Sequence, residues 1–194
     1  MRRLSKTLTA AAVLLTLASL TACGGDGDTG GLDGIGGIGG TDGKASPPKA
    51  KDVASMVRFV NEHAVCKDLE TEASAGGAAR KSFAKLPEGT AGGVKERAFC
   101  EADRGEPIVL LVVSDMKKFT QGLKAKKAAG EDGVALVGAN FAVVPDDGDT
   151  ARALTTAGML LASCDAEFNS KIPSGFTKSK GAVEGCVLTD FFPV

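Results

Sequence analysis

Thiols and the one imidazole are the side chains of this chain with the most reactive chemistry. The 194 residues include five cysteines and a single histidine, His63, and they include neither Trp nor Tyr. His63 stands three residues before Cys66, so on a helix the two side chains would share a face, where a Cys–His nucleophile or a metal pair could form. The simpler interpretation is a surface histidine beside a disulfide, and we favour it. We therefore predict no catalytic residue and no metal ligand.

A cluster of carboxylates is the second candidate site. Asp146, Asp147 and Asp149 follow an apolar segment and precede an expected helix. Such a group could bind calcium, but the terminal Glu of an EF-hand loop is missing from this sequence. Negative charge at the start of a helix interacts favourably with the helix dipole. We therefore predict that the cluster serves the helix, with Asp149 or Thr150 as the capping residue.

The sequence motifs of several common enzyme classes are missing from these 194 residues. There is no Gly-x-Ser-x-Gly, no phosphate-binding loop ending in Gly-Lys-Ser/Thr, and no Cys-x-x-Cys pair. We predict a protein that binds a protein or an envelope component without catalysis and without a cofactor. The alternative is a cell-surface enzyme whose site is built from Asp, Lys and Ser.

The charge balance argues against a nucleic-acid partner. Lys and Arg number 23 against 24 Asp and Glu, a formal net charge of −1, whereas nucleic-acid binders carry a basic excess. Lysines do gather on one expected helix, on the face opposite Phe119 and Leu123. We interpret them as a solvated helix face, with attraction to anionic lipid or an envelope polymer as the alternative. These lysines are Lys117, Lys118, Lys124 and Lys127.

The first 22 residues have the pattern of a secretory signal. Arg2, Arg3 and Lys6 form a short positive region, and residues 8–20 are mostly apolar. The apolar stretch is shorter than the roughly 20 residues that a helix needs to span a bilayer. We predict a signal peptide over residues 1–22, which directs general secretion rather than twin-arginine export.

The end of this segment resembles the lipobox of bacterial lipoproteins. The residues that carry the resemblance are Leu20, Thr21, Ala22 and Cys23. In that family the cysteine sulfur receives a diacylglyceryl group through a thioether, and the signal is cut just before it. The resemblance implies lipidation at Cys23 and a protein held at the extracytoplasmic face of the cell membrane. The alternative is an ordinary signal peptide with a chance cysteine.

Two further regions follow the lipobox. Residues 23–48 would form a flexible tether after the lipidated cysteine, since residues 24–48 hold 11 of the 26 glycines. A flexible coil of this length spans about 25–30 Å. Residues 49–194 would form one globular domain. Its four cysteines predict two disulfides in an exported protein, and we favour Cys66–Cys100 and Cys164–Cys186 among the three possible pairings because each closes a modest loop.

Hydrophobic periodicity predicts the elements of this domain. The fold class that they indicate is α+β, a mostly antiparallel sheet with packed helices, preceded by the signal peptide and a disordered Gly-rich linker. Residues 108–113 are apolar throughout, which is typical of a central strand covered on both faces. Residues 67–93 are expected to form a polar connection with at most one short helix. The expected helices are 52–66, a helix that Ser114 or Asp115 caps and that reaches about residue 129, and 149–158. The expected strands are 94–102, 107–113, 134–137, 141–144, 159–164 and 186–189.

The domain also resembles small uncharacterised lipoproteins of high-GC Gram-positive bacteria. The resemblance rests on the strand–helix stretch 108–119, on residues 140–146 and on residues 185–190. It implies the same extracytoplasmic location, and it implies no particular activity.

Overall fold

The structure is a computed structural model that describes residues 46–84 and 89–193. The predicted signal peptide, the lipobox with Cys23 and nearly all of the predicted tether lie outside the described residues. All of the described residues belong to one compact unit. No helix within the described ranges is long and apolar enough to cross a bilayer.

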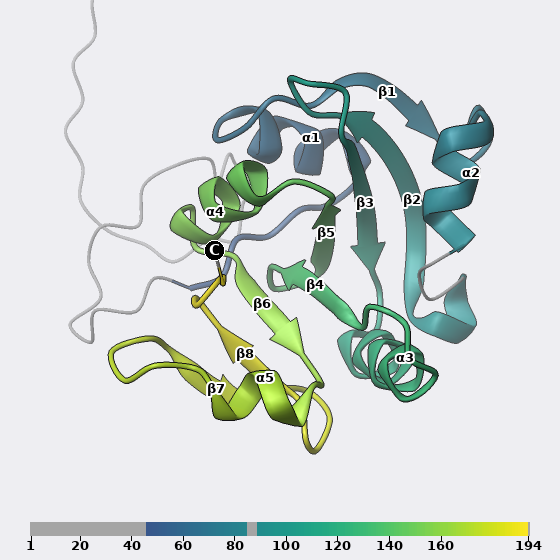
Figure 1. Cartoon of the computed structure of the whole chain (residues 1–194). Helices are drawn as coiled ribbons and strands as arrows, with labels where there is room; N and C mark the ends of the chain where they lie inside the picture. The colour runs from purple at the N-terminus through teal and green to yellow at the C-terminus, as the bar shows by residue number, and fades with distance from the viewer. Residues whose placement is uncertain (1–45, 85–88, 194) are drawn as a thin grey trace, which may run out of the picture. The chain divides into compact units, whose positions relative to one another are not determined.

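One antiparallel sheet of eight strands organises this unit (Figure 1). The strand order is β1-β2-β3-β5-β4-β6-β8-β7, so β3, β5 and β4 lie near the middle and β1 and β7 are the edges. This confirms an α+β fold built on an antiparallel sheet. The strands are β1 Lys67–Thr71, β2 Val94–Glu101, β3 Pro107–Val113, β4 Val134–Val137, β5 Phe141–Pro145, β6 Leu160–Ser163, β7 Lys178–Lys180 and β8 Val187–Thr189.

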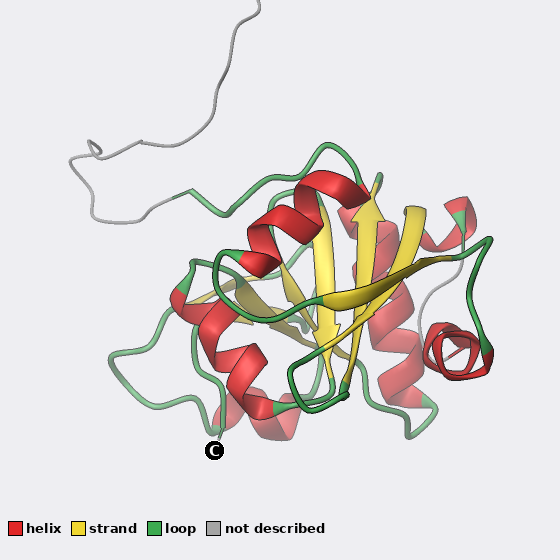
Figure 2. Ribbon diagram, turned by 90° about the horizontal axis from the view of Figure 1, so that it is seen from above, coloured by secondary structure: helices red, strands yellow, loops and turns green. Residues whose placement is uncertain are grey.

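Helices cover both faces of the sheet (Figure 2). Residues of α1 and α4 pack in one hydrophobic cluster, and residues of α2 and α3 pack in a second cluster. The central strand β3 contributes to both, because successive side chains of a strand point to opposite faces. Leu110 lies in the first cluster and Leu111 in the second, and both are fully buried. The helices are α1 Val53–Asn61, α2 Gly77–Ala84, α3 Met116–Ala128, α4 Gly148–Thr156 and α5 Ala166–Ser170.

Aspartates start four of these helices. Asp52, Asp115, Asp147 and Asp165 each adopt extended backbone geometry and accept a hydrogen bond from a backbone N–H of the first turn. The prediction that Asp149 or Thr150 caps the fourth helix is wrong. The helix begins at Gly148, and Asp147 caps it by accepting from the Thr150 N–H at 2.7 Å.

Both disulfides pair the cysteines as the sequence favours. Cys66–Cys100 ties the residue before β1 to β2, and Cys164–Cys186 ties the residue after β6 to the residue before β8. The first helix ends at Asn61 instead of continuing to residue 66. The Asn61 side chain accepts from the Cys66 N–H at 2.9 Å, which turns the chain out of the helix and toward the disulfide.

The segment of residues 67–93 is more structured than predicted. It contains the edge strand β1, which pairs with β2, as well as α2 and a 3₁₀ helix, Thr90–Gly92. Two other elements were not expected from the sequence, α5 and the edge strand β7. All of the residues of β7 and four of the five in β1 are exposed, so neither strand has the alternation of a half-buried strand.

The segment before α1 is held against the sheet by hydrogen bonds from the turn between β4 and β5, a contact that we call the clamp. The Ala139 N–H donates to the Pro48 carbonyl at 2.8 Å, and the Asn140 side chain both accepts from and donates to the backbone of Ala50, at 3.0 and 2.6 Å. A Cβ atom at Gly138 would lie 2.5 Å from the Pro48 oxygen, so glycine is needed for this close approach. Ala50 is consequently buried.

Candidate functional site

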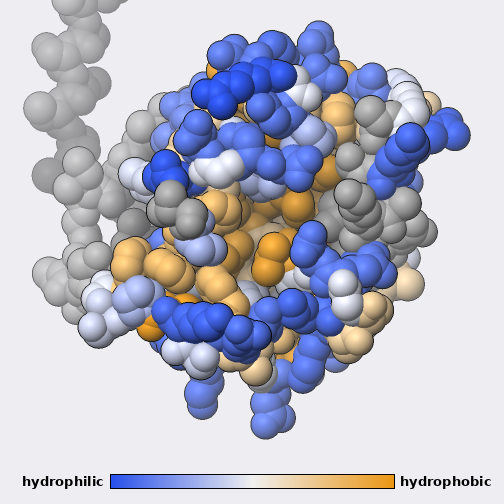
Figure 3. Space-filling model, viewed as in Figure 1, coloured by the Kyte–Doolittle hydropathy of each residue, from blue (hydrophilic) through white to orange (hydrophobic). Residues whose placement is uncertain are grey.

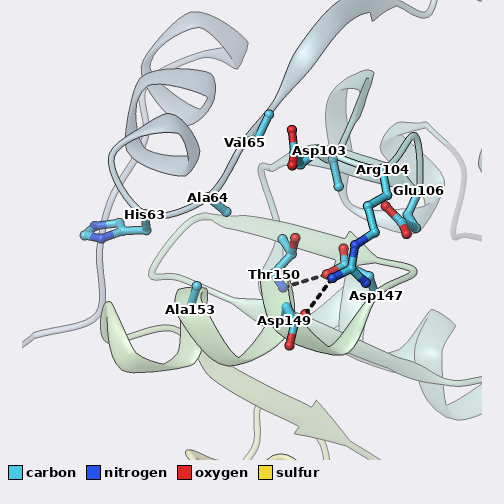
Figure 4. Close-up of a pocket in the computed structure, with 11 residues that line it drawn as sticks. His63, Ala64, Val65, Asp103, Arg104, Glu106, Asp147, Asp149, Thr150 and Ala153 are labelled. Atoms are coloured by element: carbon cyan, nitrogen blue, oxygen red, sulfur yellow. Dashed lines mark hydrogen bonds and ion pairs between the residues drawn. The ribbon is translucent and has the colours of Figure 1, made fainter.

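A polar hollow lies where three separate segments meet (Figure 4). The turn after α1 supplies His63, the turn between β2 and β3 supplies residues 102–106, and the start of α4 supplies Asp147 and Asp149. Its volume is about 330 Å³. A more open depression of about 630 Å³ continues from it along α4 and shares His63 and Asp149 with it. Together they form a groove between the end of α1 and α4.

Carboxylates dominate the charge of the hollow. Four carboxylates line it against one guanidinium, that of Arg104. The Arg104 Nη2 atom lies 3.9 Å from Asp149 Oδ2, and both side chains are more than three-quarters exposed. An exposed ion pair of this length contributes little free energy, so an incoming cation can replace Arg104. The four carboxylates belong to Asp103, Glu106, Asp147 and Asp149.

Only one of the two carboxylate oxygens of Asp147 has a hydrogen-bond partner. Its Oδ1 atom accepts the capping hydrogen bond from Thr150, whereas its Oδ2 atom is buried and has no hydrogen-bond partner among the described residues. A buried carboxylate oxygen without a donor is unfavourable, because the oxygen has lost its hydrogen bonds to water and no protein donor replaces them. A residue that lines the hollow therefore keeps an acceptor that no described residue satisfies and that an N–H donor would satisfy.

His63 and Cys66 do not form a reactive pair. The sulfur of Cys66 is bonded to Cys100, so it offers no thiolate. The His63 ring is exposed, packs edge-on against Phe59 with ring centroids 5.0 Å apart, and points away from Arg104 in Figure 4. These positions agree with the interpretation of a surface histidine beside a disulfide.

The acidic cluster forms no metal site within the described ranges, and two of the four lysines on the α3 face have local partners. No group of three or more His, Cys, Asp or Glu residues within the described ranges is arranged to hold a metal ion. On α3, Lys124 donates to the Glu184 carbonyl at 2.8 Å and Lys127 pairs with Asp165 at 2.7 Å. That hydrogen bond raises the pKa of Lys127 and lowers the pKa of Asp165.

The residues of the hollow were only partly identifiable from the sequence. Asp147 and Asp149 were singled out as candidates, whereas the turn 103–106 was expected only to connect two strands. The signal that it carried is its density of charge, three ionisable side chains in four residues. Cys23 and the rest of the lipobox lie outside the described residues. Comparisons with protein families, with curated proteins and with solved structures give no match for this chain.

Proposed function

We propose that this chain is an exported lipoprotein, held at the extracytoplasmic face of the cell membrane by acyl chains on Cys23. The sequence Leu20-Thr21-Ala22-Cys23 after a short apolar segment supports this assignment. Two disulfides in the folded domain are in keeping with it, because disulfides persist in oxidising compartments outside the cytoplasm.

Mass spectrometry of the native protein tests the anchor. The expected product begins at Cys23 and carries acyl chains there, and a Cys23→Ser variant is expected to lose them and leave the membrane fraction. A native product that still carries Met1, or one that stays soluble in the cell interior, contradicts the proposal.

The domain, in this proposal, is a binding module for a basic group of a protein or envelope component. The observation that carries it is the excess of carboxylates in the hollow together with the unpartnered oxygen of Asp147. An ammonium or guanidinium group supplies both the positive charge and the N–H donor that this wall lacks. The alternative enzyme with an Asp, Lys and Ser site has no support at the hollow, since none of its described lining residues is Lys or Ser.

Crosslinking on intact cells followed by pull-down tests the binding role. The variant Asp103→Asn with Glu106→Gln removes two charges from the hollow, and neither side chain makes a hydrogen bond or ion pair with a described residue. We expect it to recover at least tenfold less partner than the unmodified protein. The matched control is Asp132→Asn with Glu184→Gln, which removes two acids outside the hollow whose side chains likewise make no hydrogen bond or ion pair with a described residue. Equal recovery by both double variants would exclude the hollow as the binding site.

A further inference from the structure

An exposed aromatic ring projects from the loop between α5 and β7. Phe176 is 46% exposed, and it is the one aromatic residue among the large exposed hydrophobic residues of the described chain. Its ring packs edge-on against Phe191 with centroids 5.0 Å apart, and Phe191 stacks on Phe168 at 5.9 Å. Phe168 and Phe191 are half-buried, so they hold the exposed ring in a fixed position.

The loop that carries Phe176 is preformed. Asp190 accepts from the Thr177 backbone N–H at 2.6 Å and from the Thr177 hydroxyl at 2.8 Å. Gly175 has a φ of +101°, a conformation that favours glycine, and it turns the chain just before the ring. A ligand surface that meets this loop therefore does not have to order it, which removes one of the usual costs of binding.

The segment that carries the ring has more positive than negative charge, since its lysines outnumber the two nearby carboxylates, Glu167 on Lys171 and Asp190 on Thr177. Residues 171–180 contain three lysines and no acidic residue. Lys171 pairs with Glu167 at the surface, and Lys178 donates to the Asn169 carbonyl, which leaves its positive charge unneutralised. Lys180 forms no side-chain hydrogen bond or ion pair with a described residue, and it lies on the exposed edge strand β7. Figure 3 shows hydrophobic surface beside the end of β8 with hydrophilic residues next to it.

We propose that residues 171–180 dock the domain on the anionic phospholipid surface of the bilayer, with Phe176 inserted between the headgroups and the lysines lying over them. The three lysines beside one exposed apolar ring complement a surface that is anionic outside and apolar just beneath. This arrangement suits a bilayer, where each lysine near an anionic surface adds attraction and an apolar ring is buried at the boundary of headgroups and acyl chains. The proposal rests on the lipid anchor proposed above, which keeps the bilayer within reach and makes weak docking effective.

The arrangement of the domain is compatible with docking from a tethered position. Figures 1 and 2 both show the loop before β7 on the side of the domain where residues 46–50 enter. The point where the described chain enters the domain and the docking loop can therefore face the same surface. The acidic hollow is built from the turn after α1, the β2–β3 turn and the start of α4, and it contains no residue of the docking loop, so the two sites are separate.

A single tryptophan reports the docking directly, because the chain contains no Trp and no Tyr. The test uses a fragment that starts at Gly39, which contains every described residue and lacks Cys23, so the result does not depend on lipidation. Lipid is supplied at about 1–10 mM, the effective concentration that a short flexible tether provides, so weak docking is detected without the anchor. Phe176→Trp places the reporter in the loop. Leu69→Trp is the matched control, because Leu69 is 45% exposed and lies on β1, at the opposite edge of the sheet. Circular dichroism checks that both variants are folded.

Vesicles of phosphatidylglycerol and phosphatidylcholine are the probe, with pure phosphatidylcholine vesicles as the neutral comparison. We expect the Phe176→Trp emission to shift to shorter wavelength and to be quenched by brominated lipid only on the anionic vesicles. Adding Lys178→Gln and Lys180→Gln to this variant is expected to weaken vesicle binding at least tenfold, and 0.5 M salt is expected to abolish it.

Three results would overturn the docking proposal. They are an unchanged Phe176→Trp spectrum on anionic vesicles, an equal shift for Leu69→Trp, and a shift produced by lipid-free envelope protein in place of vesicles. None of them bears on the acyl chains at Cys23, which mass spectrometry tests separately. Failure of the docking proposal is thus distinguishable from failure of the anchor.

Discussion

Gly93 is a residue whose missing side chain lets β2 and α3 meet. Its φ is +76°, and a Cβ atom there would lie 2.3 Å from the Asp115 carbonyl oxygen. The Gly93 carbonyl also accepts hydrogen bonds from the backbone N–H groups of Ser114 and Asp115, at 2.8 and 3.2 Å. The start of α3 is therefore fixed on the backbone of one glycine, and a side chain at this position would push the helix away.

Gly93→Ala is expected to destabilise the domain by about 2 kcal/mol or more, because it combines backbone strain with a collision. Gly77→Ala is the control, since a Cβ at Gly77 meets nothing within 4 Å and Gly77 lies in a helix, where alanine is favoured. Urea unfolding measures both free energies. Similar values for the two variants would contradict the role given to Gly93.

Asp165 is a single residue that makes the stability of the folded domain depend on pH. The hydrogen bond from Lys127 and the capping hydrogen bonds from the N–H groups of Phe168 and Glu167 hold the pKa of Asp165 below its usual value. The folded state thus binds this proton less readily than the unfolded state does. The stabilisation is present above the unfolded-state pKa, and it is lost as the pH falls through the folded-state pKa.

Asp165→Asn is therefore expected to lower the melting temperature at pH 6 to 7 and to have a smaller effect near pH 3. Thermal unfolding of the two proteins across this range provides the measurement. A difference in melting temperature that stays constant from pH 7 to pH 3 would show that the charge of Asp165 contributes nothing.

At the scale of elements, burial decides what the sequence could predict. The continuous apolar run of β3 and the apolar spacing of α3 are consequences of burial, and both elements lie close to their expected bounds. The edge strands β1 and β7 have no buried face to mark them, and α5 is only five residues long. Their positions depend on pairing with β2 and β8 and on the Asp165 cap, which are tertiary or single-residue effects.

The candidate site was less predictable for the same reason. Asp147 and Asp149 stand out as a local cluster, but the hollow also needs His63 and the turn at residues 103–106. These segments are more than 35 residues apart in sequence, and only the packed fold brings them together. Periodicity reports which face of an element is buried, and it carries no information on which turns become neighbours.

The disulfide Cys66–Cys100 gives a prediction at this scale. It closes a loop with a sequence separation of 34 and lies beside the hollow, and both cysteines are buried. Replacing both by alanine is expected to lower the free energy of unfolding by about 3–4 kcal/mol, mostly because the unfolded chain gains freedom. Guanidinium chloride unfolding measures the change. The Cys164→Ala and Cys186→Ala pair, with a separation of 22, is expected to lose slightly less, and no loss in either would show that the bridges are not stabilising.

At the scale of the whole molecule, the two hydrophobic clusters on either side of the sheet imply that the free energy of local opening differs between its middle and its edge strands. The middle strands β3 and β5 are covered on both faces, whereas β1 and β7 are exposed at the edges. Local opening of an edge exposes little apolar surface, and opening of β3 requires both clusters to separate.

Hydrogen exchange followed by mass spectrometry is the measurement for this prediction. Peptides that contain β3 are expected to exchange only through global unfolding, and those that contain β1 or β7 to exchange roughly a hundredfold faster or more. Uniform protection across the sheet would contradict the gradient.

The clamp at Pro48 and Ala50 has a mechanical consequence. Any pull on the amino-terminal side of the domain reaches the sheet first through the two hydrogen bonds of Asn140 and the one from Ala139 to Pro48. The turn that supplies them joins β4 and β5, two strands inside the sheet. A force on the amino-terminal segment therefore acts near the centre of the sheet and not on an edge strand. Three hydrogen bonds share this force before it reaches α1. A domain attached in this way resists unfolding that starts from its amino-terminal end.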